Sequence, residues 1–175
     1  VALSHSVTAV NDAPVASGSA SLTADAEDTA AGSLNTGTVS ALFGSNFDDS
    51  ADQVAGGSTA GTLAGVAITS YSADTNKGTW QYSSDGTSWT TINSVTAASS
   101  ALTLKSTDQL RFVPTSNFNG AAPGLTVSLI DSSTSVTSGV TANVSTAGGT
   151  TAYSAATVAL SHSVTAVNDA PTTTL

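Results

Sequence analysis

The stretch VALSHSVTAVNDAP occupies residues 1–14 of this chain and occurs again, identical at all fourteen positions, at residues 158–171. Chance does not produce such a match, and convergence on a strand pattern would not fix every polar residue. The simplest origin is a tandem array with a period of 157 residues, which suits whole domains better than the coils of a solenoid. We therefore expect residues 1–10 to be the last strand of the preceding repeat, residues 11–167 to be one repeat, and residues 168–175 to be the linker to the next.

The duplication leaves two identical strands for one place in a sheet. We expect residues 1–10 either to be loosely held or to pair with a neighbouring molecule. An ordered place for both copies in one sheet would mean instead that both strands belong to one domain.

Short segments rich in β-branched and aromatic residues, separated by Gly, Asn and Ser turns, fill the chain between the two copies. Asp85-Gly86 lies between two aromatic segments and predicts a hairpin with a two-residue turn. Val39–Phe43 is the one segment suited to a turn or two of helix. The spacing predicts an all-β fold, a two-sheet antiparallel β-sandwich. The predicted strands are Val1–Val10, Leu63–Ser72, Thr79–Ser84, Thr87–Ile92, Leu102–Lys105, Gln109–Val113, Gly124–Ile130, Val140–Val144 and Thr157–Val167.

The predicted core consists of the larger apolar side chains of these segments. They are Leu22, Leu42, Phe43, Val66, Ile68, Trp80, Tyr82, Ile92, Leu102, Leu104, Leu110, Phe112, Phe118, Leu125, Val127, Leu129, Val164 and Val167.

The charge of the chain is strongly one-sided. Twelve acidic residues face three basic ones, for a net charge of −9, and only 9% of all residues are charged. Such a surface repels nucleic acid and anionic lipid and attracts cations. The chain has no cysteine, so its stability depends on its core or on bound metal. No apolar run approaches the ~20 residues that span a bilayer, and we expect no membrane insertion.

Three pieces of the sequence together resemble bacterial cadherin-like repeats, which occur in very large secreted adhesins of the repeats-in-toxin type. They are the VNDAP joint, the acidic Glu27-Asp28-Thr29, and RFVPTSNFNG followed by LTVSLID. The resemblance covers most of residues 10–171. It implies an immunoglobulin-like or cadherin-like sandwich, type I secretion to the cell surface, calcium at the joints, and a role in adhesion or biofilm.

The resemblance also implies where Ca²⁺ would be held. Cadherin-like joints gather oxygen ligands from the linker, from an acidic loop in the middle of the domain, and from an acid after a late strand. Asn11 and Asp12 match the linker, and Asp131 matches the late acid. The acidic loop corresponds to Asp48, Asp49 and Asp52. At the other end of the repeat the candidate ligands are Glu27, Asp28, Asp108, Asn168 and Asp169.

Each candidate group has a simpler interpretation. Clustered acids are also typical of a solvated loop that binds no ion. His5 and His162 occupy the same place in the two copies, and we interpret them as strand histidines rather than catalytic ones. Trp80, Tyr82 and Trp89 suit core packing, although such aromatic residues also stack on sugars. A pair of carboxylates would serve a glycosidase, but these acids lie in predicted loops.

These observations favour a structural role over an enzyme. We expect a spacer repeat of a secreted adhesin, stiffened by calcium at the joints and partnered by adjacent repeats of the same chain. A module that grips glycan or peptide is the alternative. If the chain is a spacer, we expect other domains of the adhesin to bind cell-surface glycans or proteins.

Overall fold

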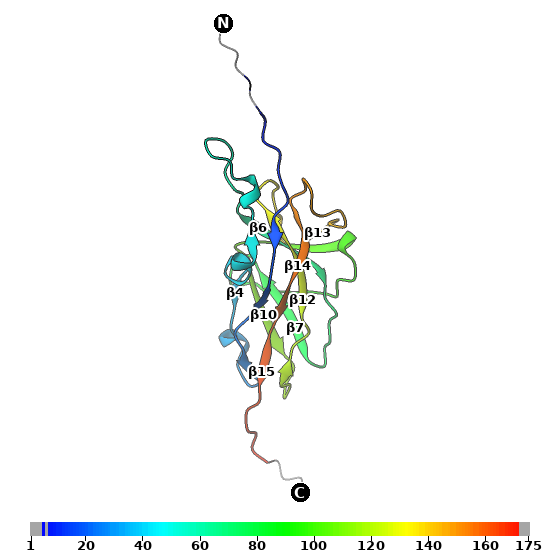
Figure 1. The fold of residues 1–175 in the computed structure, drawn as a ribbon. Helices are drawn as coiled ribbons and strands as arrows, with labels where there is room; N and C mark the ends of the chain where they lie inside the picture. Colours follow the sequence, from blue (N-terminus) through cyan, green and yellow to red (C-terminus); the bar gives the residue numbers. More distant parts are fainter. Residues whose placement is uncertain (1–4, 6, 172–175) are drawn as a thin grey trace.

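The longest strands form where Val, Ile and Leu are concentrated, because such side chains pack well on a pleated, buried surface. In the computed structural model, which describes residue 5 and residues 7–171, these strands lie side by side with β12 at their centre (Figure 1). The sheet has the order β13-β9-β6-β12-β14-β2. Its strands are β2 (Ser19–Ser21), β6 (Leu63–Ser70), β9 (Ala101–Lys105), β12 (Leu125–Asp131), β13 (Val140–Ala142) and β14 (Tyr153–Ser161).

The residues that the structure describes form three smaller sheets besides this one. The second sheet has the order β4-β10-β7-β8, and its main ladder places Phe112 opposite Trp80. A third has the order β11-β15-β3, and β1 pairs with β5. These strands are β1 (Val15–Ala16), β3 (Asp25–Ala26), β4 (Gly37–Thr38), β5 (Phe47–Asp48), β7 (Gly78–Ser83), β8 (Thr90–Thr91), β10 (Gln109–Pro114), β11 (Gly120–Ala121) and β15 (Ser163–Thr165).

The short helix forms where it was predicted, at α1 (Val39–Phe43). The Thr38 hydroxyl caps it by accepting a hydrogen bond from the Ala41 N–H, and Val39 and Phe43 are buried one turn apart. Four 3-10 turns are η1 (Ala31–Ser33), η2 (Gly44–Asn46), η3 (Ser50–Asp52) and η4 (Ala98–Ser100). No helix in the described part of the chain is long and apolar enough to cross a membrane.

The main core combines side chains from the two larger sheets, and Val127 and Leu129 of β12 belong to the same buried cluster as Trp80 and Phe112. Most of the predicted core is buried, while Leu42, Tyr82, Leu102 and Phe118 are partly buried against it. The prediction was wrong for Val167, which is 42% exposed. This residue follows the end of β15, so its side chain has no facing sheet.

The all-β class is confirmed, but two strand pairings are not antiparallel. β2 runs parallel to β14, and β3 runs parallel to β15. The reason lies in the path of the chain, which enters the body at one end and leaves it at the opposite end (Figure 1). The early strands β2 and β3 therefore run in the same direction as β14 and β15, with which they pair.

The predicted aromatic hairpin is present, but its turn is longer than two residues. β7 and β8 pair with Tyr82 opposite Thr90, which leaves residues 84–89 as the loop. The Asp85 carboxylate accepts hydrogen bonds from the Thr87 and Ser88 N–H groups and from the Ser83 hydroxyl, which holds its pKa well below the usual range. Asp85 thus organises a loop rather than occupying a tight turn.

The two copies of the repeated stretch have different surroundings. In the second copy, Val164 is 3% exposed and His162 is buried. In the first copy, Val7 is 86% exposed and His5 is also exposed, and residues 7–10 belong to no strand. Residues 1–4 and 6 lie outside the described residues, and so does that part of the predicted first strand. The same local sequence is therefore packed in the core in the second copy and exposed to solvent in the described part of the first copy.

The buried His162 imidazole is part of an aromatic group in the core. Its ring centroid lies 5.9 Å from that of Trp80 and 5.6 Å from that of Phe112. Its Nε2 lies 3.6 Å from Asp25 Oδ2, and neither imidazole nitrogen has a hydrogen-bond partner. Burial lowers the pKa of His162, and the nearby Asp25 charge opposes this shift.

We expect Val164→Ala to lower the free energy of unfolding by about 2 kcal/mol, because it removes two buried methyl groups. Val7→Ala is the same change in the same local sequence, and we expect an effect within about 0.5 kcal/mol. Chemical denaturation of both variants measures the difference. Equal destabilisation by the two substitutions would contradict the exposed position of the first copy.

We expect the free energy of unfolding to fall as the pH decreases below about 6.5, the ordinary imidazole pKa. Since folding lowers the pKa of His162, the unfolded chain takes up a proton first, and protonation favours unfolding. Denaturation curves between this pH and the carboxylate range test the effect. His162→Gln should flatten the pH dependence, whereas His5→Gln should leave it intact; the reverse pattern would refute this account.

Candidate metal centre

Apart from Asp108, the residues predicted to hold calcium lie at two opposite ends of the molecule. We call the end where the chain enters the entry pole; it contains Asn11, Asp12, Asp48, Asp49, Asp52 and Asp131. The exit pole is the end where the chain leaves, and it contains Glu27, Asp28, Asn119 and Val167–Asp169. Figure 1 shows that the chain enters the body at one end and leaves it at the opposite end.

At the entry pole the linker is fastened to the body by hydrogen bonds. The Asn11 amide Nδ2 donates to Asp131 Oδ2 at 3.2 Å and to the Thr151 carbonyl at 3.2 Å. The Asp12 N–H donates to Asp52 Oδ1 at 2.8 Å. The Ala13 N–H then donates to the Gly149 carbonyl at 2.7 Å. Three successive linker residues are therefore anchored directly after the exposed residues 7–10.

Asp131 and Asp49 are the buried acids of the entry pole. Asp131 ends β12 and is fully buried, with Oδ1 accepting from the Ser133 N–H at 2.7 Å. Asp49 is 4% exposed, and its Oδ2 accepts from the Gly61 N–H at 2.8 Å. A Cβ atom at Gly61 would collide with that oxygen. The other oxygen, Asp49 Oδ1, is buried without a hydrogen-bond partner.

Electrostatic repulsion is built into this group of acids. Burial raises the pKa of Asp49, the Gly61 hydrogen bond opposes that shift, and the charges of Asp52, Asp131 and Asp48 add to it. Asp48 itself is exposed, and the Ser50 N–H holds its pKa below the usual value. A buried carboxylate oxygen without a donor, surrounded by further carboxylates, is suited to a cation.

The acids alone do not form a closed metal cage. In the described part of the chain, no group of three or more His, Cys, Asp or Glu side chains is placed to hold a metal ion. Calcium, however, also accepts amide and backbone carbonyl oxygens. Asn11 lies against Asp131, and exchange of its amide nitrogen and oxygen would present a neutral ligand there. Asp49, Asp131, Asp52 and Asn11 carry oxygen donors of the kind that calcium accepts, although the structure does not arrange the three acids as a metal site.

The exit pole is organised around Glu27. Its Oε1 accepts from the Val167 N–H at 2.6 Å, and its Oε2 accepts from the Asn119 amide at 3.1 Å. These two hydrogen bonds, the Val167 bond first, lower the pKa of Glu27. Asn168 and Asp169 follow immediately and are exposed. The structure thus places Glu27 beside the start of the second linker, while its predicted role as a calcium ligand with Asn168 and Asp169 stays a prediction.

Two predicted ligands of the exit pole have other surroundings. Asp28 is exposed and borders a shallow hollow with Val113, Pro114 and Ser116. Asp108 is buried in the turn between β9 and β10, where Oδ2 accepts from the Lys105 N–H at 2.9 Å. Its carbonyl accepts from the Val39 N–H at 2.8 Å, and none of its described hydrogen bonds connects it to Asn168 or Asp169. Asp108 is placed as a turn-forming residue.

Sequence reasoning missed several participants at both poles. Asn119 was inside the NFNG motif and could have been chosen as a polar partner of Glu27. The carbonyls of Gly149 and Thr151 and the N–H of Gly61 carry no side-chain signal, so only the folded chain reveals them.

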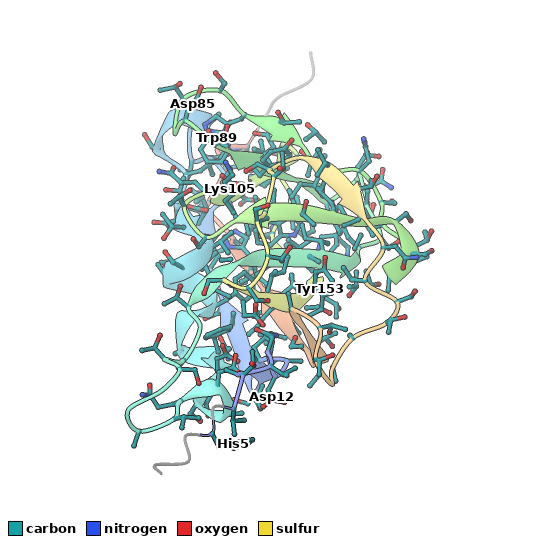
Figure 2. The ribbon with its side chains drawn as sticks, turned by 90° about the horizontal axis from the view of Figure 1, so that it is seen from above. His5, Asp12, Asp85, Trp89, Lys105 and Tyr153 are labelled. Atoms are coloured by element: carbon teal, nitrogen blue, oxygen red, sulfur yellow. The ribbon has the colours of Figure 1, made fainter. Side chains whose placement is uncertain are left out.

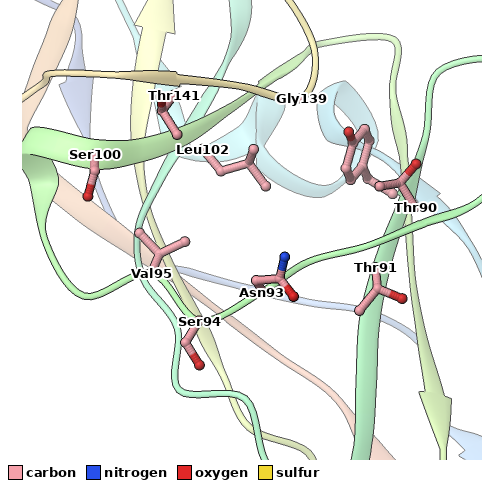
Figure 3. A pocket seen from close by; sticks show the side chains of 10 residues that line it. Thr90, Thr91, Asn93, Ser94, Val95, Ser100, Leu102, Gly139 and Thr141 are labelled. Atoms are coloured by element: carbon pink, nitrogen blue, oxygen red, sulfur yellow. The ribbon is translucent and has the colours of Figure 1, made fainter.

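A pocket of about 250 Å³ lies apart from both poles (Figure 3). Tyr82, Asn93 and Leu102 contribute to its lining, together with hydroxyl groups such as those of Thr90 and Thr141. The Tyr82 hydroxyl lies so close to Gly139 that a side chain there would collide with it. This lining is composed of hydroxyl, amide and apolar groups, and none of the predicted calcium ligands belongs to it.

Comparison with known proteins gives this chain no relatives: no family model, no curated protein and no solved structure matches it.

We expect Asp49→Asn to raise the melting temperature in a metal-free, chelator-containing buffer by about 2–4 °C, the change that about 1 kcal/mol gives in a domain of this size. The substitution removes one charge from the repulsive group, while the amide oxygen can still accept from the Gly61 N–H. Differential scanning calorimetry measures the shift. Asp74→Asn, which keeps the acceptor for the Asn76 N–H outside this group, is the matched control. A lower melting temperature for Asp49→Asn alone would contradict the repulsion.

Proposed function

We propose that this chain is a spacer repeat of a large secreted bacterial adhesin, and that calcium at the entry pole stiffens its joint with the preceding repeat. The observation that carries the proposal is the attachment of Asn11 and Asp12, from the duplicated stretch, to Asp131 and Asp52 beside the unpartnered Asp49 Oδ1. A joint whose sequence is copied without change, and which is held by the buried Asp131 and the partly buried Asp52, supports a structural unit that is used many times.

The positions of the two poles support an extended array. Since the chain enters at one end and leaves at the other, consecutive repeats would follow one another rather than fold back (Figure 1). Within the second copy, Val167 is held by Glu27 of its own repeat. The next residue, Asn168, corresponds to Asn11 and would meet Asp131 of the following repeat. The repeat boundary then falls between two adjacent residues, so the joint has no free linker.

Calcium would change the balance of charges at this joint. Asp49 and Asp131 would supply buried carboxylate oxygens, Asp52 a further carboxylate, and Asn11 an amide oxygen. Glu27 of the preceding repeat would lie on the other side of the boundary. Extracellular modules of this kind bind calcium with a Kd of about 10⁻⁴–10⁻³ M. Such sites fill outside the cell and remain largely empty in the cytosol.

The finer architecture and the setting belong to the same proposal. A core shared by the two larger sheets supports an immunoglobulin-like or cadherin-like sandwich. The acidic surface, with a net charge of −9, favours neighbouring repeats and cations over nucleic acid as partners. Export and cell-surface location rest on the sequence resemblance.

We expect a protein of two consecutive repeats to become stiffer and more extended when calcium is added. Small-angle X-ray scattering in calcium and in chelator measures the maximum dimension and its spread. Asp131→Asn in the second repeat should abolish the calcium response of the joint, because it removes a buried ligand that also orients Asn11. Asp74→Asn in the same repeat is the control and should preserve the response. Equal flexibility of the unsubstituted protein with and without calcium would refute the stiffened joint.

A further inference from the structure

A groove beside β10 is not used by the spacer role, although it shares the lining residue Ala31 with the hollow that Asp28 borders at the exit pole. It has a volume of about 650 Å³ and lies between the segment around Ala31–Thr36 and the loop that carries Gly86, Thr87 and Trp89. Arg111 and Gln109 of β10 complete its lining. Figure 2 shows Trp89 next to Asp85 in this loop, on the side of the molecule opposite Asp12.

Arg111 is held in a fixed orientation within this groove. Its Nε and Nη2 both donate to Gln81 Oε1, at 2.9 and 2.7 Å, and its Nη1 donates to the Ala31 carbonyl at 2.9 Å. The guanidinium carbon lies 4.0 Å from the centre of the Trp89 ring, in a cation–π arrangement. Of its five N–H groups, one on each terminal nitrogen remains without a described partner.

No carboxylate neutralises this guanidinium in the described part of the chain, where the one ion pair is that of His162 with Asp25. The nearest acid along the chain to Trp89 is Asp85, and its Oδ1 already accepts three hydrogen bonds from its own loop. A chain with twelve acids and three bases thus keeps its one arginine free of acidic partners.

We propose that this groove binds a carboxylated saccharide, such as a chain of uronic acid units, with the sugar carboxylate on Arg111. A rigid guanidinium with one free N–H on each terminal nitrogen suits a planar carboxylate, and its single positive charge balances one such group. This site goes beyond the spacer role and does not depend on calcium at the joints.

The rest of the groove suits a sugar better than a small inorganic anion. Its volume lies in the range of about 300–1,000 Å³ that is usual for small-molecule sites. Thr36, Thr87 and Gln109 offer hydroxyl and amide groups to sugar hydroxyls, and the half-buried Trp89 offers an aromatic edge. Thr36 and Thr87 are exposed, so the groove is open to a polymer that extends beyond it.

The two tryptophans provide a direct test on the whole chain. The Trp80 indole is buried and donates to the Pro123 carbonyl, whereas Trp89 lines the groove. In ¹H–¹⁵N correlation spectra, we expect trigalacturonate to shift the Trp89 indole signal in a saturable manner and to leave Trp80 unchanged. We expect neutral galactotriose to shift neither signal, and sulfated galactotriose to bind more weakly than trigalacturonate.

Substitutions of Arg111 distinguish the contribution of the paired guanidinium donors from that of the positive charge alone. We expect Arg111→Lys to weaken trigalacturonate binding about tenfold or more, because it keeps the charge and loses the paired donors. Arg111→Gln should abolish binding, and Lys77→Gln, which removes the same charge outside the groove, should have no effect. The dispersion of the remaining signals verifies that each variant is folded.

Several results would overturn the proposal. They are the absence of any Trp89 shift, equal binding of the neutral sugar, equal or tighter binding of the sulfated sugar, and a Trp89 shift that persists in Arg111→Gln. Binding of trigalacturonate through calcium at the entry pole would also leave Trp89 unchanged, and it would therefore count against this site.

Discussion

The last segment of the chain forms β14 and β15, which follow each other directly, and each of them is paired with a strand on both sides. This double pairing is the constraint on which the rest of the fold depends. β14 lies between β12 and β2, and β15 lies between β11 and β3. Val158, Leu160, His162 and Val164 alternate inward along this strand and are all buried. The strand thus connects the first elements of the chain with the central sheet, and it delivers the chain to the exit pole beside Glu27.

The two poles follow from this arrangement. The early strands β2 and β3 run parallel to β14 and β15, in keeping with entry and exit at opposite ends, and each end has its own polar attachment. At entry, Asn11 and Asp12 bind acids of the body; at exit, the Val167 N–H binds Glu27. Because residues 10–14 and 167–171 are identical, the attachments seen at the two ends would complement each other in the proposed array.

Much of the fold could be predicted from the sequence, because local patterns determine it. Apolar residues located β6, β10 and β12 within a few residues, and the segment Val39–Phe43 indicated the helix, although its Thr38 cap was not predicted. The parallel pairings could not be predicted, since they depend on where the chain enters the body. The loop after β7 was misjudged because Asp85 accepts three hydrogen bonds, which stabilises a longer loop than Asp-Gly suggests. At the entry pole, clustered acids and the late Asp131 were visible, but backbone partners such as Gly61 were not.

The parallel contact of β2 with β14 has a mechanical consequence. When the two termini are pulled apart, β2 is drawn toward one end of the molecule and β14 toward the other. Their hydrogen bonds, with Ser19, Ala20 and Ser21 opposite Ala159, Leu160 and Ser161, lie across the direction of pulling and are strained together in shear. An unzipping geometry would break such bonds one at a time under a smaller force. The contact of β3 with β15 is loaded in the same sense, so the fold resists tension along the axis on which an array would carry it.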